Sequence, residues 1–116
     1  DSRSEALSSR YEKNLVHLVK QLRKEFDAPN ANFVCASLGQ SEKGATDGGG
    51  KILDAVLSVD GASGKYPEFK GNVAGVYTHP LSKGSSSGGH YGGNAETYMN
   101  VGEAMGKAMV KLMKRN

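Results

Sequence analysis

The chain has 116 residues, a formal net charge of +3 and a sequence pI near 9.0, which together describe a single, mildly basic domain. The basic residues are not interleaved with aromatic ones, and no apolar run reaches the roughly 18 residues that span a membrane, so neither nucleic acid nor a bilayer is expected as a partner. The single cysteine, Cys35, excludes an internal disulfide and a cysteine-based metal cluster.

Residues 4–26 are predicted to form an amphipathic helix. Apolar residues recur every three or four positions, which places them on one helical face: Leu7, Tyr11, Leu15, Leu18, Leu22 and Phe26. The DAPN segment at 27–30 ends this helix, because the residue before Pro29 is disfavoured in the helical region. The short apolar run NFVCASL at 32–38 then predicts a strand that is buried on both faces.

The second half of the chain repeats the alternation of helix and strand. After a polar loop at 39–50, residues 51–60 predict a helix, and NVAGVYT at 72–78 predicts a second buried strand. Residues 94–115 predict a last helix that begins after a polar capping residue, Asn94. Its inner stripe is expected to consist of Tyr98, Met105, Met109 and Leu112.

The order α-β-α-β-α, with apolar strands, predicts an α/β fold whose parallel sheet is covered by helices on both faces. Two strands are too few for such a sheet, because each central strand needs a neighbour on both sides. Residues 1–116 are therefore expected to be the C-terminal portion of one larger doubly wound domain. The missing strands would come from an upstream segment of the same protein or from a second copy of the chain.

The histidines are the main candidates for chemistry. His90 lies between glycine pairs, after the second strand and shortly before the last helix, where it is either a general base or a histidine that packs beside Tyr91. His79 directly follows the second strand and is expected to be structural, and His17 is expected at the helix surface. The spacing of His79, His90 and Asp47 gives no reason for them to converge, so we predict no metal site and no cofactor.

Other motifs do not supply a nucleophile. GATDGGGKI lacks the spacing of a phosphate-binding loop, and no Gly-x-Ser-x-Gly segment occurs. Cys35, inside an apolar strand, is expected to be an inert thiol. The sequence thus offers a base, His90, without a partner to activate.

Four segments resemble a known family: YEKNLVHLVKQLRKEF, NFVCASLG, KYPEFKGNV and GGHYGGNAETYMNVGEAMGKAM. Together they are similar to the C-terminal half of sialate O-acetylesterase-like carbohydrate esterases, in the SGNH (GDSL-like) hydrolase superfamily. The subset most similar is the bacterial proteins described as acetylxylan esterases. The resemblance covers nearly the whole chain, and His-Tyr-x-x-Asn-Ala-Glu-Thr-Tyr at 90–98 is its most specific part.

The resemblance implies a three-layer, flavodoxin-like α/β/α fold and hydrolysis of acetyl esters on carbohydrate by a serine nucleophile. The family histidine matches His90, whereas the family serine would lie outside this chain, so the chain alone is expected to be inactive. Many relatives place an aspartate three residues before the histidine, and this chain has Ser87 there. The substrates of the family imply a secreted or periplasmic protein. The alternative is a non-catalytic α/β module that binds carbohydrate or a partner, including a swapped homodimer.

Overall fold

A computed structural model describes residues 2–83 and 91–114. Its helices and strands follow the predicted alternation: α1 (Glu5–Ser8), α2 (Tyr11–Glu25), β1 (Phe33–Ala36), α3 (Gly48–Ser58), β2 (Val73–Val76) and α4 (Ala95–Met113). Three single turns of 3₁₀-helix join them: η1 (Pro67–Phe69), η2 (His79–Leu81) and η3 (Tyr91–Gly93). The prediction of a mixed α/β chain is confirmed.

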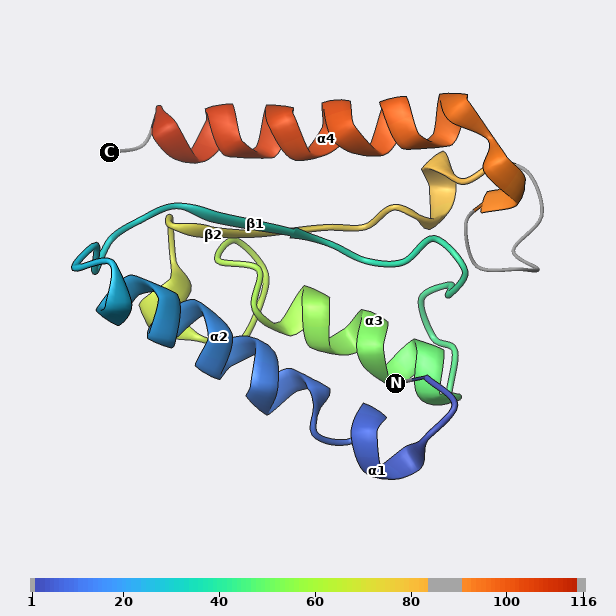
Figure 1. Cartoon of the computed structure of the whole chain (residues 1–116), viewed down its shortest axis with the longest axis horizontal. Coiled ribbons are helices and arrows are strands. Elements are labelled where there is room, and N and C mark those ends of the chain that lie inside the picture. Colours follow the sequence, from blue (N-terminus) through green and yellow to red (C-terminus); the bar gives the residue numbers. More distant parts are fainter. Residues whose placement is uncertain (1, 84–90, 115–116) are drawn as a thin grey trace.

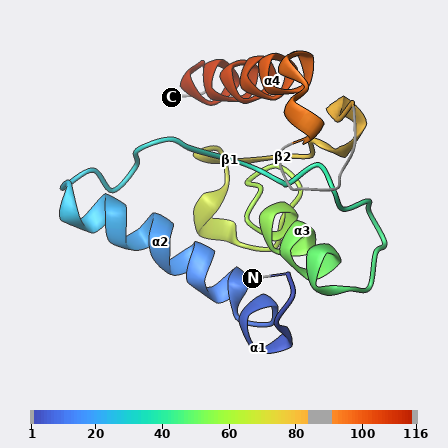
Figure 2. The same cartoon turned by 45° about the vertical axis from the view of Figure 1, so that its right-hand side comes forward.

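The described residues form a two-stranded parallel sheet between helical layers. Phe33 on β1 pairs with Val73 on β2, and the register continues to Ala36 and Val76. Figure 1 shows α4 along one face of the sheet and α2 and α3 along the other, and the turned view in Figure 2 keeps this arrangement. The two strands are parallel as predicted, and both faces of the sheet carry helices.

The first predicted helix is divided in two. α1 ends at Ser8, α2 begins at Tyr11, and the helix predicted over 4–26 is therefore interrupted at residues 9 and 10. The hydroxyl groups of Ser8 and Ser9 donate to carbonyl oxygens three residues earlier, each at 3.4 Å. Such side-chain bonds compete with the helical backbone, which explains the break.

Side-chain caps set where the later helices begin. α3 begins at Gly48, earlier than predicted, because Asp47 Oδ1 accepts a hydrogen bond from Gly50 N at 2.8 Å. α4 begins as predicted, with Asn94 Oδ1 accepting from Thr97 N at 2.8 Å. The last helix is therefore fixed in register at the end nearest to residue 90.

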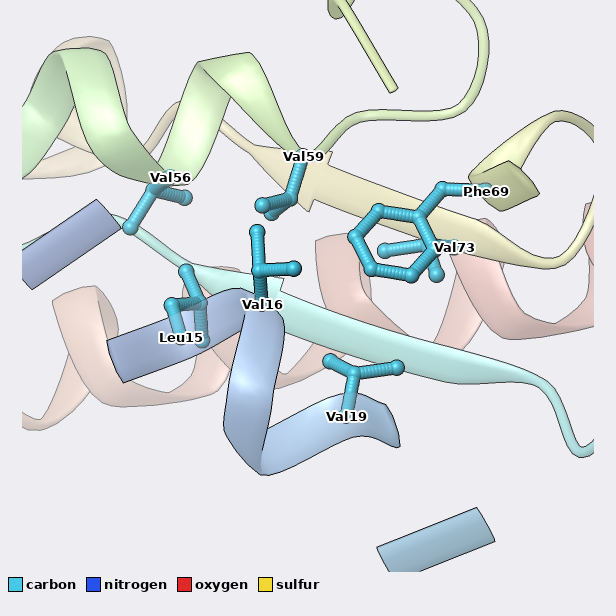
Figure 3. Packing of buried hydrophobic residues seen from close by; sticks show 7 residues of the cluster. All are labelled: Leu15, Val16, Val19, Val56, Val59, Phe69 and Val73. Atoms are coloured by element: carbon cyan, nitrogen blue, oxygen red, sulfur yellow. The ribbon is translucent and has the colours of Figure 1, made fainter. Parts of the chain in front are cut away.

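The main core lies between α2, α3 and the inner face of the sheet. Figure 3 shows its seven buried side chains gathered there: Leu15, Val16, Val19, Val56, Val59, Phe69 and Val73. Each such side chain contributes about 1.5–3 kcal/mol when it is removed from water. Two fully buried members lie where an element ends: Val59 directly follows α3, and Phe69 is the last residue of η1. The loops that follow these elements are therefore also fixed by packing.

The predicted burial of both strands is wrong. All four residues of β1 are only partly buried, and on β2 only Val73 is fully buried. The two predicted helix stripes are also only partly covered, since Leu18 is 49% exposed, Phe26 76% and Tyr98 47%. The physical reason is that the sheet within the described residues is too narrow to cover the apolar faces of α2 and α4.

Candidate functional site at the carboxyl edge of the sheet

The carboxyl ends of β1 and β2 lie together because the strands are parallel and in register. In open parallel sheets, ligands bind at the end of the sheet where the strands have their carboxyl ends, which we call the carboxyl edge. Figure 1 shows that α3 and α4 also begin on this side of the molecule. The residues that follow the strands, from Ser37 on one and Tyr77 on the other, therefore form the candidate site.

A buried pair of hydroxyl groups joins the two strand ends. Thr78 Oγ1 donates to the carbonyl oxygen of Ser37 at 2.6 Å, and Thr78 N donates to Ser37 Oγ at 3.0 Å. Since the Thr78 proton is used in this way, the 3.2 Å contact between the hydroxyls is a bond from Ser37 Oγ to Thr78 Oγ1. Both side chains are almost fully buried, so they hold the site together and neither is an accessible nucleophile.

His79 connects the two loops that leave the strands. Its Nδ1 lies 2.8 Å from the carbonyl oxygen of Gly39, and its ring stacks on Tyr77 with centroids 6.1 Å apart. A carbonyl oxygen only accepts, so Nδ1 carries a proton in this bond and Nε2 is the other ring nitrogen available for chemistry when the ring is neutral. The bond supports the structural role predicted for His79, and it places an oriented imidazole at the edge.

Tyr77 gives the loop after β1 a second contact with the loop after β2. Its hydroxyl accepts a hydrogen bond from Lys43 N at 3.2 Å, and Lys43 Nζ lies 4.8 Å from the ring centroid. The ammonium group over the ring makes a cation–π contact. This contact adds a positive charge near His79, on the solvent side of the candidate site.

Tyr91 is fixed at the same edge in a strained conformation. Its φ angle is 50°, in the left-handed region, where a bulky side chain is rare. Gly39 N donates to the Tyr91 hydroxyl at 3.0 Å, and the Tyr91 ring meets Tyr98 edge-on with centroids 5.4 Å apart. Strained backbone of this kind persists where surrounding contacts hold it, and it is concentrated at functional sites.

Gly39 is required by this close packing. A Cβ atom at this position would lie 1.7 Å from Ser82 Oγ and 2.6 Å from Tyr91 Cε1. Any side chain would therefore displace Ser82, Tyr91 or both. The glycine lets the loop after β1 reach the Tyr91 hydroxyl directly.

The described segment before residue 84 is attached to the start of α4. Lys83 N donates to Thr97 Oγ1 at 2.8 Å, and Thr97 Oγ1 lies 3.0 Å from the Lys83 carbonyl oxygen. Lys83 Nζ also pairs with Glu96 at 2.5 Å. Lys83 and Tyr91, the described residues on either side of 84–90, are thus both held at the carboxyl edge.

His90, the predicted catalytic residue, lies outside the described residues, as does Ser87. The structure therefore places its sequence neighbour Tyr91, and it leaves the role of His90 as a prediction. Cys35 lies in β1 and is only partly buried. Its burial first, and then the charge of Asp60, raises the pKa of its thiol to about 11, which agrees with the predicted inert thiol. His17 lies on the exposed face of α2.

Among the residues that the structure describes, no three histidine, cysteine, aspartate or glutamate side chains are grouped so that they could hold a metal ion. None of the described helices is long and apolar enough to cross a membrane. No protein-family model, curated protein or solved structure matches the chain.

Several site residues were missed by the sequence prediction. Ser37 and Thr78 were included in apolar strand runs, and the roles of Gly39 and Tyr91 were not foreseen. The available signal was a polar residue at the carboxyl end of each predicted strand. Because parallel strands end at the same edge of a sheet, this signal would have placed Ser37 and Thr78 close together.

Proposed function

We propose that the chain is part of a serine esterase that removes acetyl groups from carbohydrate, and that His90 is its general base. The resemblance of the 90–98 segment to sialate O-acetylesterase-like and acetylxylan esterases is the first support. The observation that carries the proposal is the fixed, left-handed Tyr91 at the carboxyl edge, since it ties the residue after His90 to Gly39 at the end of β1.

His90 would take the proton of a serine hydroxyl as that oxygen attacks the acetyl carbonyl. It would then return the proton to the sugar hydroxyl that leaves, and water would release acetate in the second half of the reaction. Hydrogen-bond donors near the serine would stabilise the tetrahedral oxyanion. Three protein parts are therefore needed: the base, the serine and the oxyanion donors.

The described hydroxyls nearest to the edge do not fit the serine role. Ser37 and Thr78 are buried and bonded to each other, and Ser82 Oγ donates to the Thr78 carbonyl oxygen at 3.3 Å. The thiol of Cys35 is held protonated by its raised pKa. The resemblance places the family serine upstream of this segment, and we propose that polypeptide outside these 116 residues supplies it. We also propose that the substrate, an acetylated polysaccharide, places the protein outside the cytoplasm.

The test is acetate release by the full product of the gene. Acetylated xylan, an acetylated sialic acid and p-nitrophenyl acetate are the substrates. We expect turnover that His90→Ala lowers by at least about 1,000-fold, as is usual for the loss of a triad member. His17→Ala, at an exposed position on α2, is the matched control and is expected to keep full activity.

The 116-residue chain alone is expected to release no acetate under the same conditions. Activity of that isolated chain which His90→Ala abolishes would refute an external serine. A folded, full gene product that cleaves none of the three esters would refute the esterase proposal and would favour the alternative, a non-catalytic binding module.

A further inference from the structure

The outer edge of β2 is closed by the turn that follows α3. Gly61 N donates to the carbonyl oxygen of Val73 at 2.9 Å, and Gly75 N donates to Asp60 Oδ1 at 3.1 Å. Asp60 Oδ2 is held in turn by the backbone N–H and the hydroxyl of Ser63. A capped edge of this kind does not accept another strand.

The outer edge of β1 is open within the described residues. Phe33 N donates to the carbonyl oxygen of Asn72, just before β2, and Ser37 N donates to that of Val76. The alternation of a strand therefore turns the backbone groups of Val34 and Ala36 outward. No other described residue bonds to these outward groups. β1 thus presents a row of unpaired donors and acceptors.

α2 leaves an apolar flank beside this open edge. Leu22 and Phe26 are 38% and 76% exposed, and with Phe33 they line a groove of about 240 Å³ next to the start of β1. Toward β2, Lys20 of α2 pairs with Glu68, and Arg23, which also lines the groove, bonds to Asn72, the residue before β2. The uncovered flank of α2 therefore faces away from β2.

α4 leaves a matching flank on the opposite face of the sheet. On one side of α4, Lys111 lines a cavity with Asp60, next to the outer edge of β2. The opposite side of α4 therefore lies above the space next to the outer edge of β1. Tyr98 confirms this direction, because it packs on Tyr91, which reaches Gly39 just after β1. The flank carries no charged residue and consists of Tyr98, Gly102, Met105, Gly106, Met109 and Met113.

We propose that this β1 side binds a further β-strand that runs parallel to β1, is apolar on both faces and belongs to the polypeptide that supplies the nucleophile. This inference rests on the proposed function. The open backbone groups of β1 require a strand, and the two helix flanks would cover both of its faces. The parallel direction follows β1 and β2, which are already parallel between helical layers, as in sheets that are all parallel and covered on both faces.

The area of the β1 side allows such an occupant, and the symmetry of a dimer argues against a second copy. The molecule measures 39 × 32 × 24 Å, and Figure 1 looks along its shortest axis, nearly edge-on to the sheet. A side of 39 × 32 Å leaves room for the roughly 800 Å² per partner of a stable interface. A second copy could present only its own β1, because its β2 edge is closed, and a two-fold pair of that kind would be antiparallel.

The test is amide hydrogen exchange, measured on the 116-residue chain and on the full gene product. We expect the amides of Val34 and Ala36 to exchange at least about 100-fold more slowly in the full product, since they become hydrogen-bonded strand amides there. The amide of Gly75, already bonded to Asp60, is the internal control and should exchange similarly in both.

Two matched variants on α2 test whether the slow exchange depends on the groove beside β1. In the full product, Leu22→Lys puts a charge into the groove and should speed exchange at Val34 and Ala36 at least about tenfold. Gln21→Lys adds the same charge on the exposed polar face of α2 and should not. Gly102→Gln is the second test: a Cβ there meets nothing within 4 Å, so we expect the isolated chain to keep its fold and the full product to exchange Val34 and Ala36 at least about tenfold faster.

Three results would overturn the inference: equally fast exchange of Val34 and Ala36 in both proteins, a gene that encodes no further polypeptide, or protection in the isolated chain that rises with a dimeric mass in sedimentation. The last would show a second copy as the occupant. Exchange does not depend on catalysis. An inactive product with slow exchange would remove the proposed function alone, and an active product with fast exchange would remove this inference alone.

Discussion

The hydrogen bonds between Ser37 and Thr78 predict how a substitution at Thr78 changes the free energy of unfolding. Thr78→Val keeps the volume of the side chain but removes the donor to the Ser37 carbonyl oxygen and the acceptor for Ser37 Oγ. Both positions are nearly solvent-free, so water does not replace the lost partners. An orphaned buried polar group costs about 1–3 kcal/mol, and we therefore expect a loss of about 2–3 kcal/mol in the free energy of unfolding.

Thr78→Ser makes the opposite change at the same position. It keeps the hydroxyl and removes one buried methyl group, which costs about 1 kcal/mol. Urea unfolding of the 116-residue chain at pH 7, followed by circular dichroism, measures both variants. We expect valine to be the more damaging substitution, although it is the closer match in shape.

The reverse order would refute this account of the site. If Thr78→Val were as stable as the wild-type chain, or more stable than Thr78→Ser, packing would govern the position and the hydroxyls would contribute little. The hydrogen bonds would then not be what holds the loops of Gly39 and His79 together.

Three further predictions concern other parts of the chain. Gly39→Ala should lower the free energy of unfolding by about 1–3 kcal/mol because its Cβ has no room, whereas Gly102→Ala, in open space on α4, should raise it by about 0.5–1 kcal/mol; urea unfolding compares them. The hydrogen bond to Glu12, followed by burial, raises the pKa of Tyr66 from 10.0 to about 12. The stabilising effect of this bond should therefore be complete below pH 10 and lost as the pH rises through 12. The difference in free energy of unfolding between wild type and Tyr66→Phe, measured at each pH, should disappear at the alkaline end, and a constant difference would contradict the bond. Cys35, with its pKa of about 11, should react with a thiol reagent at pH 8 at least about tenfold more slowly in the folded chain than in urea, and equal rates would show an accessible thiolate.

The order of elements could be predicted because each one has a strong local signal. The run of apolar residues at 33–36, the Asn94 cap and the apolar run at 73–76 lie within the segments that were predicted. The boundaries that differ depend on single side chains. Ser8 interrupts the first helix, and Asp47 starts α3 early, through hydrogen bonds that periodicity does not reveal.

The candidate site could be predicted only in part, because it depends on long-range contacts. Gly39 and Tyr91 are 52 positions apart in the chain, and no local pattern indicates that one would bond to the other. The same is true of Ser37 and Thr78, whose pairing follows from the register of β1 and β2. His90 was singled out from its glycine neighbours and the family resemblance, and it stays a prediction.

The partly buried strands and the uncovered helix stripes have one physical explanation. On α2 the predicted stripe is centred near Leu18 and Leu22, whereas the buried face is centred near Val16 and Val19, so the apolar face is wider than the surface that covers it. A periodic apolar stripe is costly to leave in water, and its width indicates the width of the layer that it was selected to cover. Because the excess on α2 lies beside the open edge of β1, the uncovered apolar residues and the open backbone groups lie on the same side of the sheet. A strand that runs parallel to β1 there would end at the carboxyl edge that holds Gly39 and Tyr91, and this edge is where ligands bind in open parallel sheets.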